Sequence, residues 1–293
     1  MRTNITMDQA AGLRRMANPR PVKVIAVTSG KGGVGKTNVS VNLSMALSQA
    51  GKDVLLLDAD LGLANVDVLL GLRPRHTLSD VINGSRALEE IIINGPESLK
   101  IIPASSGVKN MADLNSMEHA GIIRAFSELS HSIDVLMIDT AAGISDSVIT
   151  FTRAAQEVIV VVCDEPTSIT DAYALIKVLN KDYGIRRFRV ITNMVQSLQE
   201  GRELFKKIMT VTDKYLDVQL DFTGMVPYDD FLKKSVQRQK AVIDAYPRSK
   251  SALAFKRLSA KADKWPIQGN AGGHVEFFLE RLIQASQEME ASL

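Results

Sequence analysis

Cysteine is almost absent from this chain of 293 residues, with Cys163 as the single one. One cysteine excludes an intrachain disulfide, a CxxC redox pair and a metal or iron–sulfur site built from several thiolates of one chain. Aromatic residues are scarce at 5%, so the core must be mostly aliphatic. Basic and acidic residues nearly cancel, at 35 against 33. Bulk charge therefore gives no reason to expect nucleic-acid binding.

Long hydrophobic runs are also missing. The longest unbroken apolar run, 158–163, is far shorter than the roughly 20 residues that a membrane-spanning helix needs. Residues 1–20 are polar and lack the apolar segment of a signal peptide. These absences predict a cytoplasmic protein that is at most peripheral at the inner membrane or the cell pole.

From residue 22 onward, short apolar runs rich in β-branched residues alternate with longer amphipathic stretches. Runs that are apolar throughout are typical of strands covered on both faces, and this alternation indicates right-handed βαβ units. The expected strands are 22–27, 54–57, 99–102, 135–138, 158–162, 188–192 and 221–226, and the expected helices are 38–50, 117–130, 168–181 and 198–215. The predicted fold class is α/β, a three-layer and mostly parallel sheet with helices on both faces.

The most specific motif is a glycine-rich segment directly after the first expected strand. Residues 30–37 match G-x-x-x-x-G-K-[ST] and precede a helix, the context in which this pattern binds a nucleoside triphosphate. Glycines let backbone N–H groups face phosphate oxygens, and the helix start adds positive potential. We expect Lys36 to reach the β and γ phosphates and Thr37 to bind Mg²⁺. The expected nucleotide contacts are Gly30, Lys31, Gly32, Gly33, Val34, Gly35, Lys36, Thr37 and Asn38.

Polar side chains follow three other expected strands, at the edge where open α/β sheets bind ligands. Asp58 and Asp60 have the i, i+2 spacing that directs two strand residues to one side. Asp139 ends an apolar strand in the Walker B arrangement and is expected to hold Mg²⁺ through water. Asn193 carries an amide that can donate to and accept from a purine edge, and the missing N-K-x-D pattern favours ATP over GTP.

Together these motifs resemble the MinD/ParA family of P-loop ATPases over most of the chain, from Lys23 to Asp229. The string K-G-G-V-G-K-T, with its additional lysine at Lys31, is similar to the deviant Walker A motif of that family. The resemblance implies that Lys31 crosses to a partner subunit and contacts its nucleotide. ATP with Mg²⁺ would then form part of the interface of a homodimer.

The same resemblance implies roles for the remaining residues. Asp60 would polarise the attacking water, with Lys31 and Lys36 as the other catalytic residues, and Asp58 would lie near Mg²⁺ and Lys36. Asn193 would read adenine. A second loop would contact the base through Pro227, Tyr228 and Asp229.

The first 21 residues are expected to form a flexible arm ahead of the ATPase domain, 22–268. Residues 8–14, D-Q-A-A-G-L-R, resemble the D-Q-A-x-x-L-R motif of the FlhG/FleN family of flagellar number regulators. This resemblance implies slow ATP hydrolysis in a switch that restrains a FleQ-like flagellar transcriptional activator and acts with an FlhF-like GTPase. The implied partner-binding residues are Asp8, Gln9, Leu13 and Arg14.

Other functions stay open at this point. A ParA- or MinD-type positioning ATPase could act on nucleoid DNA or a membrane surface, and residues 233–264 hold ten Lys or Arg against two Asp, a net charge of +8. A solvated helical face is the favoured explanation of that charge, and we expect no specific DNA binding. A metabolic ATP-dependent carboxylase or amide ligase would need a further catalytic cluster, which the four scattered histidines do not supply. An iron–sulfur carrier would need a cysteine pair.

Residues 269–293 are expected to be a linker and a C-terminal amphipathic helix. The segment resembles the membrane-targeting helix of MinD-type proteins, but four glutamates oppose Arg281, and anionic membranes attract basic faces. Two interpretations follow: weak membrane contact through 274–290, or packing of the helix on the protein itself.

Overall fold

The computed structural model describes residues 21–60, 65–104, 125–126, 133–266, 281–285 and 287–288. The expected arm motif at residues 8–14 and nearly all of the expected helix 117–130 lie outside these ranges. The strands are β1 (Lys23–Ser29), β2 (Val54–Ala59), β3 (Ile93–Asn94), β4 (Lys100–Ile102), β5 (Val135–Ala142), β6 (Glu157–Val162), β7 (Arg187–Val195) and β8 (Gln219–Pro227). The helices are α2 (Lys36–Gln49), α3 (Val66–Leu70), α4 (Leu78–Ile82), α5 (Leu88–Ile91), the short 3₁₀ turn η1 (Pro96–Ser98), α7 (Asp146–Ala154), α8 (Pro166–Lys181), α9 (Leu198–Tyr215), α10 (Asp230–Gln237), α11 (Val242–Ala245) and α12 (Lys250–Asp263).

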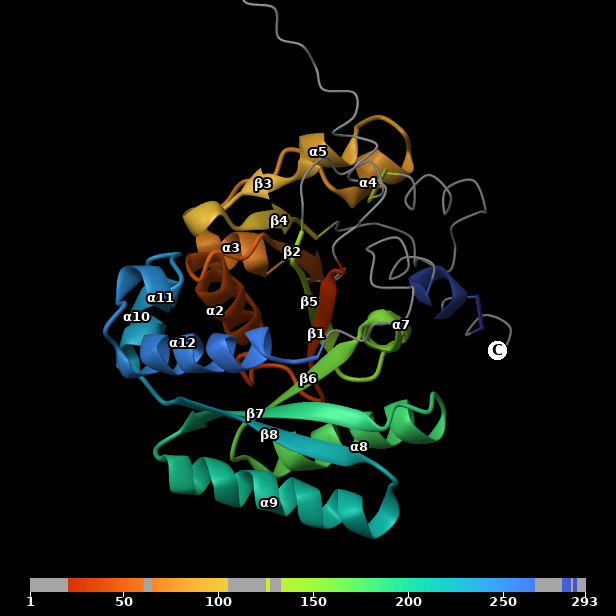
Figure 1. Cartoon of the computed structure of the whole chain (residues 1–293), viewed down its shortest axis with the longest axis vertical. Helices are drawn as coiled ribbons and strands as arrows, with labels where there is room; N and C mark the ends of the chain where they lie inside the picture. Colours follow the sequence, from red (N-terminus) through yellow and green to blue (C-terminus); the bar gives the residue numbers. More distant parts are fainter. Residues whose placement is uncertain are drawn as a thin grey trace, which may run out of the picture.

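The strands form one sheet in the order β3-β4-β2-β5-β1-β6-β7-β8 (Figure 1). Every neighbouring pair is parallel except the short edge pair of β3 and β4. The chain leaves β1 toward one side of the sheet and later leaves β5 toward the other side. The carboxyl ends of β1 and β5 therefore lie at a topological switch point, which is where open α/β sheets bind ligands.

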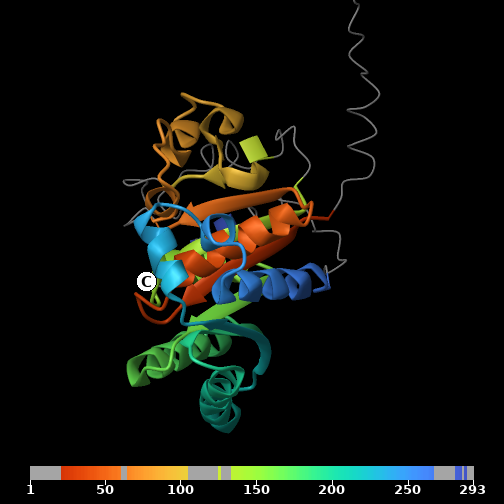
Figure 2. The same ribbon diagram turned by 90° about the vertical axis from the view of Figure 1, so that its left-hand side faces the viewer.

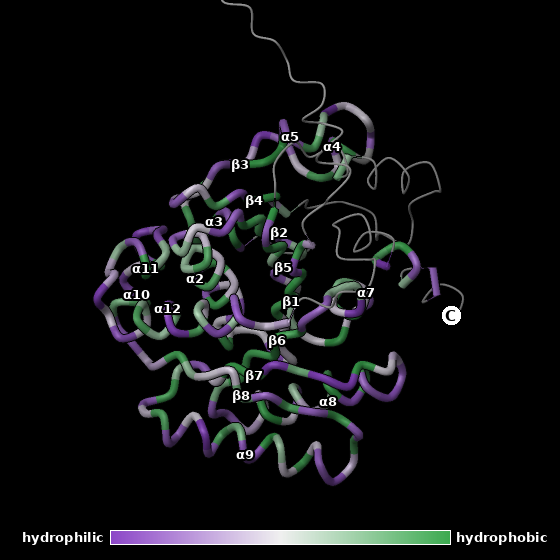
Figure 3. The backbone as a smooth tube through the Cα atoms, in the orientation of Figure 1, coloured by the Kyte–Doolittle hydropathy of each residue, from purple (hydrophilic) through white to green (hydrophobic). Residues whose placement is uncertain are grey.

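The central strands are apolar on both faces because each face is covered by helices (Figures 2 and 3). In β1, Ile25 and Val27 pack with residues of α2, α11 and α12, whereas Val24 and Ala26 face the side covered by α7. Successive strand residues point to opposite faces, so one apolar run serves two cores. Helices α8 and α9 complete the second layer against β6 and β7. Burying each large aliphatic side chain contributes about 1.5–3 kcal/mol.

Helix α2 begins directly after Gly35 and is buried along almost its whole length between the sheet and α12. Helix α9 is different: Leu204, Ile208 and Thr212 are buried on one side, and most of its charged residues are exposed on the other. Its start is fixed by Ser197, whose hydroxyl accepts a hydrogen bond from the backbone N–H of Glu200. The buried helix positions the glycine-rich loop, and the amphipathic one shields the sheet from water.

The predicted fold class is confirmed, and all seven expected strands are present with slightly different ends. The antiparallel edge strand β3, of two residues, was not among the expected strands. Residues 281–285 are helical, with Leu282 buried in the core beneath α7. Within the described part of the chain, no helix combines the length and the apolar character that a bilayer-spanning segment needs.

Candidate nucleotide-binding site

The glycine-rich loop joins the carboxyl end of β1 to the start of α2. Gly33 and Gly35 adopt φ of +82° and +87°, which side chains rarely tolerate. Gly30 adjoins α8 so closely that an added Cβ would lie 2.1 Å from the carbonyl carbon of Asp171. The loop shape therefore depends on glycine at specific positions, as expected for a backbone that must approach phosphate groups.

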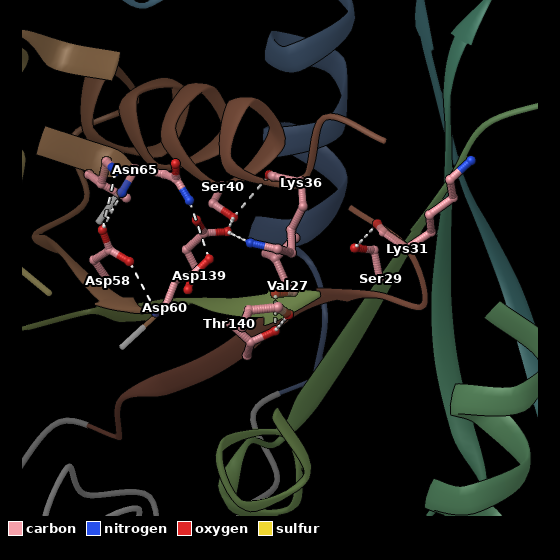
Figure 4. A network of polar contacts seen from close by, with 12 residues as sticks. Val27, Ser29, Lys31, Lys36, Ser40, Asp58, Asp60, Asn65, Asp139 and Thr140 are labelled. Carbon is pink, nitrogen blue, oxygen red and sulfur yellow. Dashed lines mark hydrogen bonds and ion pairs between the residues drawn. The ribbon is translucent and has the colours of Figure 1, made fainter. Parts of the chain in front are cut away.

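A buried ion pair lies beneath this loop (Figure 4). Lys36 Nζ is 2.9 Å from Asp139 Oδ1, and the hydroxyl of Ser40 donates to the same oxygen at 2.7 Å. Asp139 is fully buried, and its second oxygen, Oδ2, has no hydrogen-bond partner. Buried carboxylate oxygens without a partner are costly and call for a ligand. A hydrated Mg²⁺ held by water is the group that this oxygen fits.

Asp58 is the last residue but one of β2 and lies beside Asp139, its neighbour in the sheet register. Its carboxylate accepts hydrogen bonds from the backbone N–H groups of Asp60, Asn65 and Val66. Burial, and next the charge of Asp139, raise the pKa of Asp58 to about 7. Two carboxylates at this spacing favour a divalent cation, which would offset their repulsion.

Asp60 lies at the end of the same strand and is less buried than Asp58. The side-chain amide of Asn65 donates to Asp60 Oδ2 at 3.2 Å, which orients the carboxylate (Figure 4). Thr37 occupies the first turn of α2, half-exposed next to Lys36. Asn38 follows with its side-chain oxygen buried and unpartnered. The structure thus brings Lys36, Asp60 and the expected metal-binding side chains to one edge of the sheet.

Lys31 is set apart from this cluster. Its side chain points away from Lys36 and Asp139 (Figure 4). Its Nζ lies 2.8 Å from the carboxylate of Glu165 and 2.8 Å from the hydroxyl of Thr167, at the start of α8. The hydrogen bond with Glu165 raises the pKa of Lys31. The side chains of the two lysines in this loop therefore point in different directions.

On the side expected to face the base, Asn193 contacts the loop itself. Its Nδ2 donates to the carbonyl of Val34 at 2.7 Å, while its Oδ1 is buried without a partner. The free acceptor fits an amino group such as that of adenine. An added Cβ at Gly35 would lie 2.3 Å from Asn193 Nδ2, so glycine is needed there for this contact too.

In the second loop expected to contact the base, the carboxylate of Asp229 is engaged in hydrogen bonds within the protein. Asp229 caps α10 by accepting from the N–H of Phe231, and it also accepts from the N–H and hydroxyl of Ser251. Tyr228 is half-exposed at the strand end, and Pro227 closes β8. Asp229 therefore holds α10 and α12 together, and the ring of Tyr228 is the accessible group of this loop.

Sequence reasoning missed three residues of the site. Ser40 lies one helical turn after Lys36, so its i+4 spacing could have placed it beside Asp139. Glu165 and Thr167 have no local signal in the sequence, because they approach Lys31 only through the pairing of β1 with β6.

The arrangement of the lysine and carboxylate side chains in this site suits phosphoryl transfer to water. Mg²⁺, held by Thr37 and by water on Asp139 and Asp58, would neutralise charge on the phosphate oxygens.

The comparisons with known proteins agree with this geometry. The ParA family model, described as NUBPL iron-transfer P-loop NTPase, matches residues 21–262. The chain is 60% identical over 272 residues to the antiactivator FleN of Pseudomonas aeruginosa, covering 93% of this chain and 97% of that protein. It is 34% identical to the flagellum site-determining protein YlxH of Helicobacter pylori, covering 91% and 92%.

Among solved structures, the septum site-determining protein MinD of Pyrococcus horikoshii, complexed with Mg-ADP, superposes with a TM-score of 0.66 at 27% identity. The superposition covers 83% of this chain and 96% of that one. P-loop NTPases of this kind use ATP with Mg²⁺. The chain therefore belongs to the ParA/MinD family of P-loop NTPases, among the relatives of the antiactivator FleN.

Proposed function

We propose that this chain is an ATP-operated dimerisation switch that hydrolyses ATP slowly and regulates flagellar number by restraining a FleQ-like transcriptional activator. The name antiactivator, carried by a relative 60% identical, supports restraint of an activator. The name flagellum site-determining protein, carried by a second relative, supports a flagellar role.

The observation that carries the switch is the divergence of the two loop lysines. Lys36 is buried against Asp139 in its own subunit, whereas Lys31 is held at the surface by Glu165. An exposed ion pair of this kind contributes little stability, so the lysine can readily exchange its carboxylate partner for another anion. Lys31 can therefore leave Glu165 for a phosphate of a second subunit at small cost. Two subunits that exchange this lysine would enclose both nucleotides.

The carboxyl end of β5 is the element that would respond to the nucleotide. Thr140 donates to the carbonyl of Val27, and the N–H of Gly143 donates to the carbonyl of Ser29 at 2.8 Å. Both contacts tie this loop to the strand that leads into the phosphate loop. Asp60, oriented by Asn65, would position the attacking water. Loss of the γ-phosphate would remove the contacts that hold both loops, and the dimer would dissociate.

The proposal includes an FlhF-like GTPase as a second partner, bound through Asp8, Gln9, Leu13 and Arg14. These residues lie outside the described part of the chain, so the support is their resemblance to the D-Q-A-x-x-L-R motif. Weak membrane contact through 274–290 is the least supported part, because Arg153 of α7 donates to the carbonyl of Ala285. This contact favours packing of the described C-terminal residues on the protein.

Light scattering with a non-hydrolysable ATP analogue and Mg²⁺ tests the switch. Wild type and Lys52→Ala, which removes another exposed lysine of an ion pair, should form dimers. Lys31→Ala should stay monomeric and keep its nucleotide affinity within a few-fold. A normal dimer in Lys31→Ala would overturn the proposal. Moving a population from 1:99 to 99:1 requires about 5.5 kcal/mol of preference for the dimer.

The partner is tested by affinity capture in ATP and in ADP, with identification by mass spectrometry. Recovery of a flagellar transcriptional activator in ATP alone is the expected result. Recovery of nucleoid DNA alone, with salt-sensitive and sequence-independent binding, would instead establish a positioning ATPase.

A further inference from the structure

Strand β7 ends in a bulge beside the phosphate loop. Its pairing with β8 shifts register between Asn193 and Val195, so Met194 is an extra residue in the ladder. The shift reverses the faces of the strand: Ile191 packs in the core with α2, whereas Val195 packs in the core with α8 and α9. In a regular strand, residues four positions apart share one face. Bulges of this kind redirect a side chain and are frequent beside ligand sites.

Met194 is the residue whose backbone accommodates this bulge. Its φ is +59°, one of four positive values among the non-glycine residues that the structure describes. The left-handed region is unfavourable for methionine, because the Cβ then crowds the following carbonyl oxygen. Unfavourable backbone conformations persist only where the surrounding structure imposes them, and they are concentrated at ligand sites.

The methyl end of Met194 lies against the phosphate loop. Its Cε is 3.4 Å from the position that a Cβ on Gly35 would occupy, and the side-chain nitrogen of Asn193 is closer still to that position. Two successive residues of β7 thus reach the same glycine, whereas a regular strand directs successive side chains to opposite faces. Met194 is nevertheless 43% exposed. The thioether is therefore held beside Gly35 with much of its surface uncovered.

The neighbouring polar group indicates which ligand covers this thioether. Asn193 Oδ1 is buried without a hydrogen-bond partner and fits the amino group of adenine. A purine whose amino group meets this oxygen lies next to Gly35, and therefore next to the methyl group of Met194. The backbone N–H of Tyr228 donates to the carbonyl of Val195 at 2.9 Å, so the second base loop adjoins the bulge. Aromatic rings are favourable contacts for a thioether.

We propose that Met194 is a specificity-determining residue of the nucleotide site, whose thioether packs on a face of the purine ring while Asn193 contacts the amino group. The bulge holds the thioether in place before the nucleotide arrives, so little side-chain freedom is lost on binding. This contact is made with the base and not with the phosphates. The proposal rests on nucleotide binding at the phosphate loop and not on the dimer, so ADP tests it separately from the dimerisation switch.

Calorimetry on the full chain with ADP and with pyrophosphate, each with Mg²⁺, separates the base from the phosphates. Met194→Ala should bind ADP about three- to tenfold more weakly than wild type, and pyrophosphate within about twofold of wild type. Leu253→Ala is the matched control, because it removes an apolar side chain of α12 that is 42% exposed, and it should bind both ligands as wild type does. Met194→Leu keeps an apolar side chain of similar volume and should restore most of the ADP affinity.

A second measurement follows the methyl group itself by nuclear magnetic resonance, with isotope-labelled methionine methyl groups. The Met194 resonance should move upfield when ADP is added, because the ring current of a purine shields a methyl group above its face. Pyrophosphate should leave this resonance nearly unmoved. Met45, which is buried in α2, provides the internal reference.

Unchanged ADP affinity in Met194→Ala would overturn the proposal. So would an equal loss of affinity for ADP and for pyrophosphate, because a purely structural effect on the loop at Gly35 would weaken both ligands. A Met194 methyl resonance that does not move with ADP would overturn it as well. Thermal melts of each variant establish that it is folded.

Discussion

The two ends of the sheet differ in how their buried polar groups are satisfied. At the amino end, Arg189 makes a two-pronged ion pair with Glu157 and a further one with Asp221. Lys23 donates from the same end to the last carbonyls of α12. At the carboxyl end, Asp139 and Asn193 each keep a buried oxygen without a partner.

This difference separates buried polar groups that hold the fold together from buried polar groups that bind a ligand. A buried charge whose hydrogen bonds are completed by the protein specifies how helices and strands join. A buried oxygen that the protein leaves unpaired costs free energy until a ligand completes it. Changes to the buried polar groups at the amino end should therefore act on stability alone, and changes to those at the carboxyl end should act on nucleotide binding as well as stability.

Gly30→Ala should have the largest effect of all. Its Cβ would meet the backbone of Asp171, which cannot move without shifting α8. We expect a loss of about 5 kcal/mol or more in the free energy of unfolding, or failure to fold. Gly32→Ala is the matched control, because its Cβ would have no neighbour within 4 Å. Thermal melts of both variants measure the effect, and equal melting temperatures would contradict the packing argument.

Arg189→Ala should come next, at about 3–5 kcal/mol, because it leaves Glu157 buried without its partner. It also removes the cation that lies 4.7 Å from the ring centroid of Trp265. Arg186→Ala removes a neighbouring exposed arginine and should be close to neutral. Urea unfolding gives the difference. ATPase activity of folded Arg189→Ala should match wild type, and a selective loss of activity would break the distinction between the two ends.

Asp58→Asn tests the carboxyl end through pH. The pKa of Asp58 rises from 3.8 to about 7 on folding, because the buried carboxyl prefers its neutral form. Its contribution to stability is thus complete below about pH 4 and is lost as pH rises toward 7. Without nucleotide and Mg²⁺, wild type should lose up to about 4 kcal/mol over this range relative to Asp58→Asn. Parallel pH profiles of the two proteins in urea would contradict the burial argument.

Glu165→Gln should have the smallest effect on stability. The Lys31–Glu165 pair is exposed, so water replaces it at little cost. We expect a shift of less than about 2 °C in melting temperature, compared with Lys207→Ala, which breaks another surface pair. A shift as large as that of Arg189→Ala would show that Lys31 is part of the folded framework instead of a group available to a second subunit.

Much of the fold was predictable because the informative patterns are local. An apolar run that ends in aspartate, or a glycine-rich segment between strand and helix, carries its meaning within about ten residues. For this reason the strands, α2 and the positions of Lys36, Asp58 and Asp139 follow from the chain alone. The edge strand β3 was missed because two residues carry no periodicity.

Contacts between distant segments could not be predicted in the same way. Asp229 was expected at the base, and what could not be predicted is that its carboxylate joins α10 to α12, because α12 passes beside β8. Asn193 was expected to read adenine, and its side chain also supports the loop at Val34, 159 positions earlier. Each of these depends on which elements become neighbours.

The amino-acid sequence by itself determined the phosphate loop, the acidic strand ends and the alternation that builds a parallel sheet. These features depend on backbone freedom, side-chain chemistry and spacing along a continuous segment. Only the tertiary structure decided which partner holds Lys31, which oxygens stay unpaired, and that the bulge of β7 brings Met194 to the phosphate loop. The order of strands in the sheet controls these outcomes, and it arises from packing of the whole chain instead of any local pattern.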